Sequence, residues 1–364
     1  MQVHVGAMVR RLPIASTGRI IVVRSLPGLG DLLCSVPALR ALRAAFPLAH
    51  ITLLGLPGTK WFADRFASLL DDWIAFPGYP GIPEGWQGVQ AIPSFLAQMQ
   101  AQAFDAAIQL HGNGCYMNSF TTLLGAKCNS GFFVPGQFCP DPQRFLPYSE
   151  TESEVWRLLR LMELLEFPLQ GDELEFPIWD AEAQSYHQIA IAHHLEPGTY
   201  ICLHAGANSS DRRWSPEGFA KVADALAGKG YRIVLTGTAA EQPVVTAVMQ
   251  AMQMPSLNLA GYTDLGTLAA LLQQAALLIC NDTGVSHLAA ALKVPSVVIF
   301  SNSEVRRWAP LDRNRHRVVC HQKSGYHGSN TVTVTTVLQQ AQDLLGQNNR
   351  SLSEPSSDLE VSYV

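Results

Sequence analysis

Residues 277–292 constrain the fold most strongly, because the character of the chain changes twice within them. An apolar run, Leu-Leu-Ile-Cys, is followed by a polar turn, Asn-Asp-Thr-Gly-Val-Ser-His, and then by an Ala/Leu-rich run. Val285, Leu288 and Leu292 recur at helical spacing, so the order is strand, loop, helix. That order is the repeating unit of α/β domains with parallel sheets. We expect Thr283 to cap the helix, whose free backbone N–H groups favour a phosphate-bearing ligand.

The same pattern opens the chain. Residues 19–24 form a short apolar run, and a glycine-bearing turn follows over 25–31. Apolar side chains at helical spacing predict a helix over 32–46, and the next strand is predicted at 51–54. This βαβ opening indicates a doubly wound α/β domain.

The pattern restarts near residue 199, so we predict two Rossmann-like doubly wound domains that face each other across a cleft. The 364 residues are enough for two domains of ordinary size. Prolines mark the region between them, and residues 128–150 are expected to be irregular. The predicted order is an N-terminal extension at 1–18, a first Rossmann-like domain at 19–176, a connection at 177–198, a second Rossmann-like domain at 199–345 and a disordered tail at 346–364.

Composition excludes several classes of protein. Apolar residues make up 48% and charged residues 15%, which suits a globular protein with large cores. A net charge of −5 argues against general nucleic-acid binding. The seven cysteines lack zinc-ligand or redox spacing, so no metal is expected. With no secretory signal or membrane-spanning run, we expect a cytoplasmic protein. Peripheral contact with the membrane face is left open, because Arg40 and Arg43 are either a solvated helix face or contacts to an anionic surface.

Ligands of open α/β sheets bind at the carboxyl ends of the strands. In the first domain, the loops at 25–31 and 111–114 occupy that place. In the second domain, the corresponding loops are 204–213, 236–241 and 281–287. We therefore expect the functional residues in these five loops.

Three motifs in these loops resemble glycosyltransferase family 9, the ADP-heptose:lipopolysaccharide heptosyltransferase family. They fall in the family's order within residues 19–310: Arg24 with Gly28-Leu29-Gly30-Asp31, Leu203-His204-Ala205-Gly206-Ala207 with Arg212-Arg213-Trp214-Ser215-Pro216, and Asn281-Asp282-Thr283-Gly284-Val285-Ser286-His287-Leu288. The resemblance implies a GT-B fold and a metal-independent, inverting glycosyltransferase without a cofactor. It implies ADP-heptose as donor and a lipid-linked or oligosaccharide acceptor of the lipopolysaccharide type.

On the acceptor side, the resemblance implies that Asp31 is the catalytic base. Inverting transfer needs a group that takes the proton of the acceptor hydroxyl as it attacks the anomeric carbon. Gly30 lies beside this aspartate, and His111 and Asn113 could contact the acceptor sugar. The alternatives are an ordinary acidic residue in the first turn of a helix and a tight turn that tolerates histidine and asparagine.

On the donor side, the resemblance implies a diphosphate site and a ribose site. A fixed cation would stabilise the charge that gathers on the leaving diphosphate. The family often has lysine where this chain has Arg212, and arginine keeps the charge but changes the geometry. These residues also have ordinary interpretations. Arg212 and Arg213 could be solvated loop charges, Glu241 a charged residue in the first turn of a helix, and His287 a structural histidine. The implied donor residues are Arg212, Arg213, Glu241 for the ribose, Asp282, Thr283, Gly284 and His287.

Other functions make different demands. A Rossmann dehydrogenase would need Gly-x-Gly-x-x-Gly after the first strand and an acidic residue after the second. Here Leu33 stands at the third glycine's place and Gly55 follows the second strand, so both signals are missing. A nucleotide-sugar epimerase is disfavoured because no extra acid–base pair is evident. A family member using another nucleotide sugar, or a non-catalytic nucleotide-sugar binder, remains an alternative.

Overall fold

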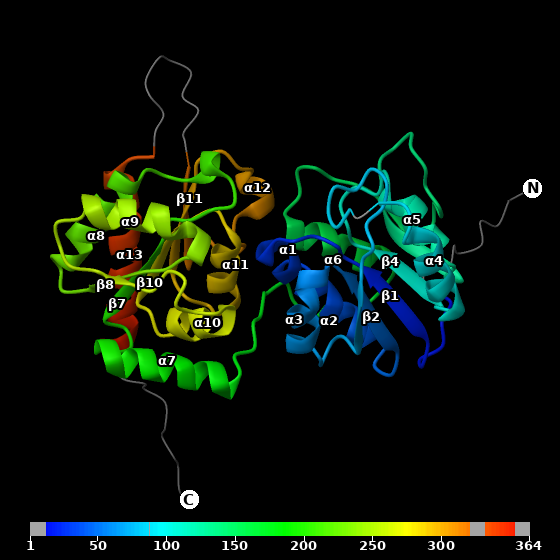
Figure 1. Cartoon of the computed structure of the whole chain (residues 1–364), viewed down its shortest axis with the longest axis horizontal. Helices are drawn as coiled ribbons and strands as arrows, with labels where there is room; N and C mark the ends of the chain where they lie inside the picture. Colours follow the sequence, from blue (N-terminus) through cyan, green and yellow to red (C-terminus); the bar gives the residue numbers. More distant parts are fainter. Residues whose placement is uncertain (1–11, 87, 321–331, 354–364) are drawn as a thin grey trace, which may run out of the picture. The chain divides into compact units, whose positions relative to one another are not determined.

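The computed structural model describes residues 12–86, 88–320 and 332–353, which fall into two units (Figure 1). Unit 1 comprises Met1–Pro177 and Arg306–Trp308, and unit 2 comprises Ile178–Val305 and Ala309–Val364. Each unit contains one six-stranded sheet whose strands are all paired in parallel. Figure 1 shows helices around each sheet. The prediction of two Rossmann-like α/β domains is confirmed.

The sheet of unit 1 reverses its strand order beside β1. Its order is β3-β2-β1-β4-β5-β6, so Ile20 of β1 pairs with Ile51 on one side and with Ala106 on the other. The loops after β1 and β4 therefore emerge next to each other, where such sheets bind ligands. The strands are β1 (Arg19–Val23), β2 (His50–Gly55), β3 (Asp72–Ala75), β4 (Ala106–Gln109), β5 (Cys128–Phe133) and β6 (Phe145–Pro147).

Helices cover both faces of this sheet. Successive residues of β1 point to opposite faces, and its apolar residues are therefore all fully buried. Ile21 and Val23 join a core cluster with Phe120, while Ile20 and Val22 are equally buried on the other face. The helices are α1 (Leu29–Leu33), α2 (Val36–Ala45), α3 (Lys60–Arg65), α4 (Ile92–Ala101), α5 (Met117–Leu123) and α6 (Glu154–Leu164), with a 3₁₀ turn, η1 (Pro57–Thr59).

Two expectations for unit 1 are wrong. The single helix predicted over 32–46 is two helices, α1 and α2, because Ser35 and Pro37 start a second helix with proline near its first position. The region 128–150, predicted to be irregular, holds β5 and β6. The short strand β6 lies at the sheet edge, where Pro147 removes no ladder hydrogen bond, so the prolines there do not exclude a strand.

Unit 2 repeats the reversal. Its order is β12-β11-β10-β7-β8-β9, so the loops after β7 and β10 emerge side by side. The strands are β7 (Tyr200–His204), β8 (Arg232–Leu235), β9 (Leu257–Asn258), β10 (Leu277–Asn281), β11 (Ser296–Phe300) and β12 (His316–Cys320). The helices are α7 (Asp180–His193), α8 (Pro216–Ala227), α9 (Gln242–Ala251), α10 (Leu265–Gln273), α11 (Gly284–Ala291) and α13 (Val334–Ser353), with 3₁₀ turns η2 (Ser210–Arg212) and η3 (Ala239–Glu241). The short helix α12 (Val305–Trp308) belongs to unit 1 except for its first residue.

The two units divide close to the start of the predicted connection. The stretch 177–198, predicted as a connection with a short helix between Pro177 and Pro197, contains helix α7, which packs against α10, and the division between units follows Pro177. Helix α13 continues to Ser353, although a disordered tail was predicted from 346. A single glycine at 346 costs a helix only about 1 kcal/mol, too little to end it. Residues 1–11 of the predicted extension and 354–364 of the tail lie outside the described residues.

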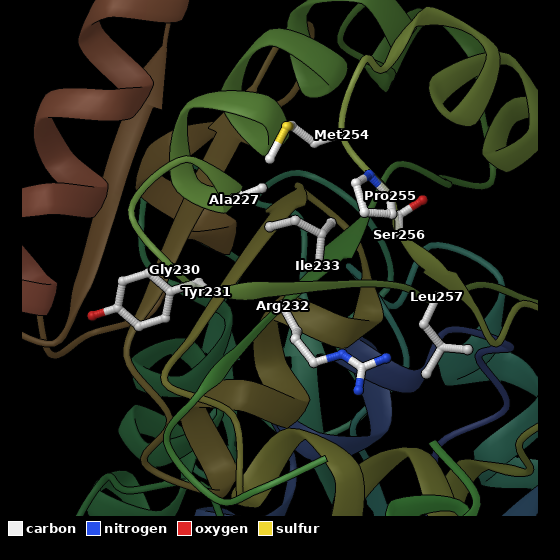
Figure 2. A pocket seen from close by; sticks show the side chains of 9 residues that line it. All are labelled: Ala227, Gly230, Tyr231, Arg232, Ile233, Met254, Pro255, Ser256 and Leu257. Atoms are coloured by element: carbon white, nitrogen blue, oxygen red, sulfur yellow. The ribbon is translucent and has the colours of Figure 1, made fainter. Parts of the chain in front are cut away.

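A small pocket of about 210 Å³ lies in unit 2 at the amino ends of the strands, away from the loops that carry the predicted site residues (Figure 2). Arg232 and Leu257, which line it, are the first residues of β8 and β9, so this is the amino edge. The Arg232 guanidinium already donates to the backbone carbonyl of His194 at 3.1 Å. This pocket is therefore separate from the loops at the carboxyl ends, where the predicted site residues lie.

Candidate active site

The buried amide of Asn281 organises the candidate donor loops of unit 2. It lies at the end of β10, next to the end of β7, and its side chain is fully buried. Its Nδ2 donates to the Ala205 carbonyl at 2.8 Å, and its Oδ1 accepts from the Trp214 backbone N–H at 2.9 Å. One side chain thus fixes both ends of the loop after β7. Asn281 lies in the stretch 277–292, but no role for its side chain was predicted from the sequence. The one sequence feature that could have indicated a role is a polar amide at the end of a buried strand.

The start of helix α11 differs from its predicted capping. Thr283 occupies the N-cap position with an extended backbone, but its side chain makes no capping hydrogen bond. Its carbonyl instead accepts from the backbone N–H of Ser286 at 2.9 Å and from the Ser286 hydroxyl at 2.8 Å. The expectation of a threonine cap is therefore wrong, although the helix begins where the sequence predicted.

Asp282, Gly284 and His287 lie together at this helix start. Asp282 is 3% exposed, and its Oδ2 has no hydrogen-bond partner within the described residues. His287 is also buried, one turn into α11. A buried carboxylate oxygen without a donor is costly, and the hydroxyl of a bound sugar is one group that could satisfy it.

Glu241 lies where β8 leads into helix α9. Its Oε2 accepts from the Thr238 backbone N–H at 2.7 Å and from the Thr238 hydroxyl at 3.0 Å. A Cβ on Gly206 would lie 1.9 Å from Glu241 Oε1, so the close approach of this carboxylate to the loop after β7 requires glycine. His204 Nε2 is 3.8 Å from the same carboxylate. Burial lowers the pKa of His204, against the opposing effect of Glu241.

The two arginines of the loop after β7 have different surroundings. Arg213 donates from Nε at 3.1 Å and from Nη2 at 2.8 Å to the carbonyl of Ala207, so it braces its own loop. It also lines an open pocket of about 540 Å³ together with Lys221. Arg212 is half-exposed at the end of η2. Arg213 therefore braces its loop while remaining exposed, and Arg212 is the less exposed of the two cations.

In unit 1, Asp31 lies in the first turn of α1, just after β1. A Cβ on Gly28 would lie 2.2 Å from Asp31 Oδ2, so glycine leaves room for the carboxylate in its present position. Burial raises the pKa of Asp31; Arg24 and Arg307 act against that rise and Glu154 adds to it. A carboxyl whose pKa is raised is a stronger base, as general-base catalysis requires.

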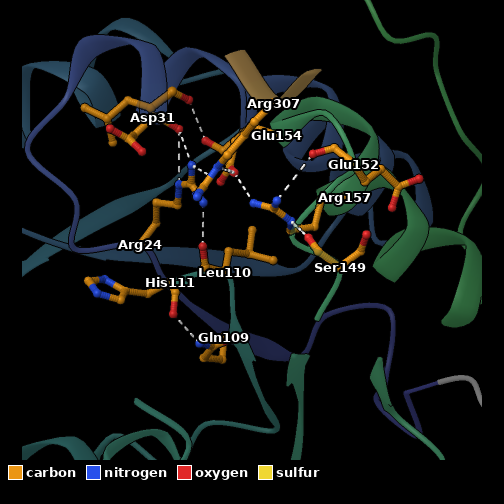
Figure 3. A network of polar contacts seen from close by, with 12 residues as sticks. Arg24, Asp31, Gln109, Leu110, His111, Ser149, Glu152, Glu154, Arg157 and Arg307 are labelled. Atoms are coloured by element: carbon orange, nitrogen blue, oxygen red, sulfur yellow. Dashed lines mark hydrogen bonds and ion pairs between the residues drawn. The ribbon is translucent and has the colours of Figure 1, made fainter. Parts of the chain in front are cut away.

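Sequence reasoning missed the charged cluster beside Asp31. Arg24 contacts the Asp31 and Leu110 carbonyls, and the carboxylate of Glu154 contacts Arg24, Arg157 and Arg307 (Figure 3). Arg24 was quoted only as part of a motif, and Glu154 lies 130 residues away from it along the chain. The one available signal was a pair of ionisable residues, Glu154 and Arg157, on the otherwise apolar face of a predicted helix.

His111 and Asn113 lie in the loop after β4, where they line one open pocket of about 310 Å³ with Glu84, Tyr116 and Tyr148. His111 is buried, and its Nε2 is 4.0 Å from Glu84 Oε2. Burial and, secondarily, Arg24 lower the pKa of His111 to about 4, so the ring is neutral at pH 7. Asn113 Oδ1 accepts from the Cys115 backbone N–H at 3.1 Å, which gives it a turn-forming task as well.

Arg40 and Arg43 are engaged within unit 1. Arg40 pairs with Glu175 at 3.1 Å, and Arg43 pairs with Asp71 at 2.6 Å. Arg43 also donates to the Ala49 carbonyl at 2.7 Å. These contacts account for both side chains without a membrane surface.

Within the described residues, no group of three or more His, Cys, Asp or Glu side chains is placed to hold a metal ion. Among the same residues, no helix is long and apolar enough to cross a membrane.

A family model identifies the family of this chain. The family model of glycosyltransferase family 9 (heptosyltransferase) matches residues 92–334. A lipooligosaccharide heptosyltransferase 2 from Haemophilus influenzae is 31% identical over 104 residues, which cover 28% of this chain and 30% of that relative. The match thus spans less than a third of that relative's length.

Solved structures resemble nearly the whole chain. A glycosyl transferase family 9 structure from Veillonella parvula has a TM-score of 0.76 at 21% identity, covering 93% of this chain and 99% of that one. The E. coli ADP-heptose lps heptosyltransferase II has a TM-score of 0.71 at 20% identity, covering 91% and 99%. At this identity the likeness shows the fold, and it confirms the predicted GT-B architecture.

Proposed function

Because the chain belongs to glycosyltransferase family 9, we propose that it is an inverting, metal-independent glycosyltransferase that moves heptose from ADP-heptose to a lipopolysaccharide-type acceptor. The observation that carries the proposal is the half-buried Asp31 side chain at the switch point of the unit 1 sheet, whose carboxyl has a raised pKa that suits a general base. The name of the similar E. coli enzyme supports ADP-heptose as the donor.

In this mechanism Asp31 accepts the proton of an acceptor hydroxyl. The hydroxyl oxygen forms a bond to the anomeric carbon of the donor sugar on the face opposite the diphosphate. The bond from that carbon to the diphosphate oxygen breaks, and its electron pair leaves with ADP. Attack from the opposite face inverts the anomeric configuration, and no covalent sugar–enzyme bond is needed.

We assign donor binding to unit 2. Arg212 and Arg213 stabilise the charge that gathers on the leaving diphosphate, and the backbone N–H groups of Thr283 and Gly284 bind its oxygens. Asp282, with its unpartnered buried oxygen, accepts from a donor hydroxyl. His287 supports the phosphate side, and Glu241 accepts from the ribose hydroxyls.

We assign acceptor binding to unit 1, where Gly30 precedes Asp31 in α1 and where His111 and Asn113 lie in the loop after β4, the strand beside β1. The neutral His111 ring and the Asn113 amide are suited to sugar hydroxyls, because each can hydrogen-bond without carrying a charge. A lipid-linked acceptor implies work at the cytoplasmic face of the membrane, which is part of the same proposal.

A thermal-shift screen of nucleotide sugars tests the donor assignment. We expect ADP-heptose at 100 times its Kd to stabilise the protein by about 2.7 kcal/mol, whereas UDP- and GDP-sugars should have little effect. Arg212→Ala should weaken ADP-heptose binding about tenfold or more, because it removes a charge-assisted contact to phosphate.

The control for that variant is Lys229→Ala, which removes an exposed cation just before β8, at the opposite edge of the sheet. It should bind ADP-heptose as the wild type does. Stabilisation by UDP-sugars alone would contradict the ADP-heptose assignment. Loss of transfer in EDTA would contradict the metal-independent mechanism.

A further inference from the structure

Arg24 holds two loops of the unit 1 site at once. It follows β1 and is 1% exposed. Its Nε and Nη2 donate to the Asp31 carbonyl at 3.1 and 2.5 Å, and its Nη1 donates to the Leu110 carbonyl at 2.5 Å (Figure 3). Leu110 precedes His111 in the loop after β4. The planar guanidinium is suited to this task because it offers several donors in fixed directions.

Glu154 is the counter-ion that makes this arrangement possible. It lies at the start of α6 and is 3% exposed, with Oε1 3.1 Å from Arg24 Nη2. Its Oε2 accepts from Arg157 and, at 3.1 Å, from Arg307 Nε. These three guanidinium groups hold the pKa of Glu154 below its ordinary value although burial raises it. A buried arginine needs such a partner, because an unpaired buried charge is strongly destabilising.

Taking the proposed transfer reaction as the starting point, we propose that Arg24 and Glu154 form a positioning pair for Asp31. Arg24 fixes the backbone that carries the Asp31 carboxyl, and the negative charge of Glu154 offsets the cations that surround this carboxyl. Neither side chain touches the substrates in this role. Together they keep Asp31 both in place and basic enough to accept a proton.

The charges that face Asp31 come from three elements. Arg24 follows β1, Glu154 begins α6, and Arg307 lies on α12 in the segment that belongs to unit 1. Behind them, Arg157 lies between Glu154 and the Tyr148 ring, whose centroid is 4.4 Å from its guanidinium carbon. His111 is neutral above about pH 4 and adds no charge at neutral pH.

These contacts predict opposite effects for two substitutions. Glu154 raises the pKa of Asp31 and Arg307 lowers it, while burial makes the largest contribution. Glu154→Gln should therefore move the acid limb of the kcat/KM profile to lower pH, and Arg307→Gln should move it to higher pH. We expect each limb to move by about half a pH unit or more. A merely structural pair would reduce activity without opposite shifts.

Arg24→Lys tests positioning separately from charge. Lysine keeps the cation but cannot make the same forked contacts to the Asp31 and Leu110 carbonyls. We expect kcat to fall about tenfold to a hundredfold. The acid limb should stay in place and ADP-heptose affinity in unit 2 should not change.

The matched controls are Glu163→Gln and Arg160→Gln, which alter the exposed pair joined at 2.7 Å on the same helix. Both should keep the wild-type profile. If Glu154→Gln does not fold, as judged by its melting temperature, Arg307→Gln and Arg24→Lys decide the matter, since Arg307 is the outer member of the cluster, 25% exposed.

Failure of the pair is distinguishable from failure of the proposed reaction. Wild-type protein that binds ADP-heptose but transfers no sugar would overturn the reaction itself. The positioning pair would be overturned if the wild type transfers sugar but the substitutions have no effect. In that case the acid limb stays in place in Glu154→Gln and Arg307→Gln, and Arg24→Lys keeps the wild-type kcat. Shifts of the same sign for Glu154→Gln and Arg307→Gln would also contradict it.

Discussion

At the residue scale, the Asn281 side chain makes the most specific prediction for unit 2. Asn281→Ala leaves the Ala205 carbonyl and the Trp214 N–H buried without partners. Each unsatisfied group costs about 1–3 kcal/mol. We therefore expect urea denaturation to show a loss of about 2–4 kcal/mol in the free energy of unfolding, together with weaker ADP-heptose binding.

Asn302→Ala is the control for this loss. The exposed Asn302 side chain donates to Asp211 at 2.7 Å, and its removal should cost less than about 0.5 kcal/mol. Equal losses in the two variants would show that the buried amide does not organise the loop.

Individual residues were predictable where a motif placed them in a loop. Asp31, Glu241 and Asp282 do lie at the carboxyl edges of their sheets, as the sequence indicated. Their partners were not predictable, because Arg24 and Glu154 meet only through tertiary packing. The bracing of its own loop by Arg213, and the unused hydroxyl of Thr283, also depend on loop geometry that residue type does not determine.

At the element scale, the packing of α7 on α10 depends on Gly266. A Cβ there would lie 1.7 Å from Glu182 Oε1, while Glu182 Oε2 accepts from the Trp179 backbone N–H at 2.8 Å. Gly266→Ala should therefore destabilise unit 2 by about 1–3 kcal/mol, because either α7 or the Glu182 side chain must move. Urea denaturation measures this loss.

A double-mutant cycle with Glu182→Ala checks the cause. The double variant should be less destabilised than the sum of the single variants, because the overlap disappears with the glutamate side chain. Gly228→Ala, where an added Cβ has no neighbour nearer than 3.4 Å, serves as the control. Additive losses would show that Glu182 is not what the new methyl group meets.

Elements with strong periodicity were predictable, and short or interrupted ones were not. The buried strands β1, β7 and β10 have apolar runs bounded by glycine or polar turns, and each formed where predicted. The strand β5 contains a glycine, the short strand β6 ends in a proline, and both gain stability from the sheet beside them. The stabilisation that a strand gains from its neighbours in the sheet cannot be predicted from its local sequence.

At the scale of the whole molecule, the restart of the strand–loop–helix pattern predicted two α/β domains. The strand order within each sheet was not readable, because pairing joins segments far apart in the chain. Glu154 and Arg307, for example, are separated by 153 residues yet share an ion pair within unit 1. The site in each unit follows from that order, since the reversal brings two loops together at one sheet edge.

The central claim is that Asp31 removes the proton of the acceptor hydroxyl. The most direct measurement compares heptose transfer from saturating ADP-heptose by the wild type, Asp31→Asn and the exposed control Asp64→Asn, with donor affinity measured in parallel. We predict that Asp31→Asn binds the donor normally but transfers about 10²- to 10⁴-fold more slowly, while Asp64→Asn keeps the wild-type rate. Transfer by Asp31→Asn at the wild-type rate would contradict the assignment.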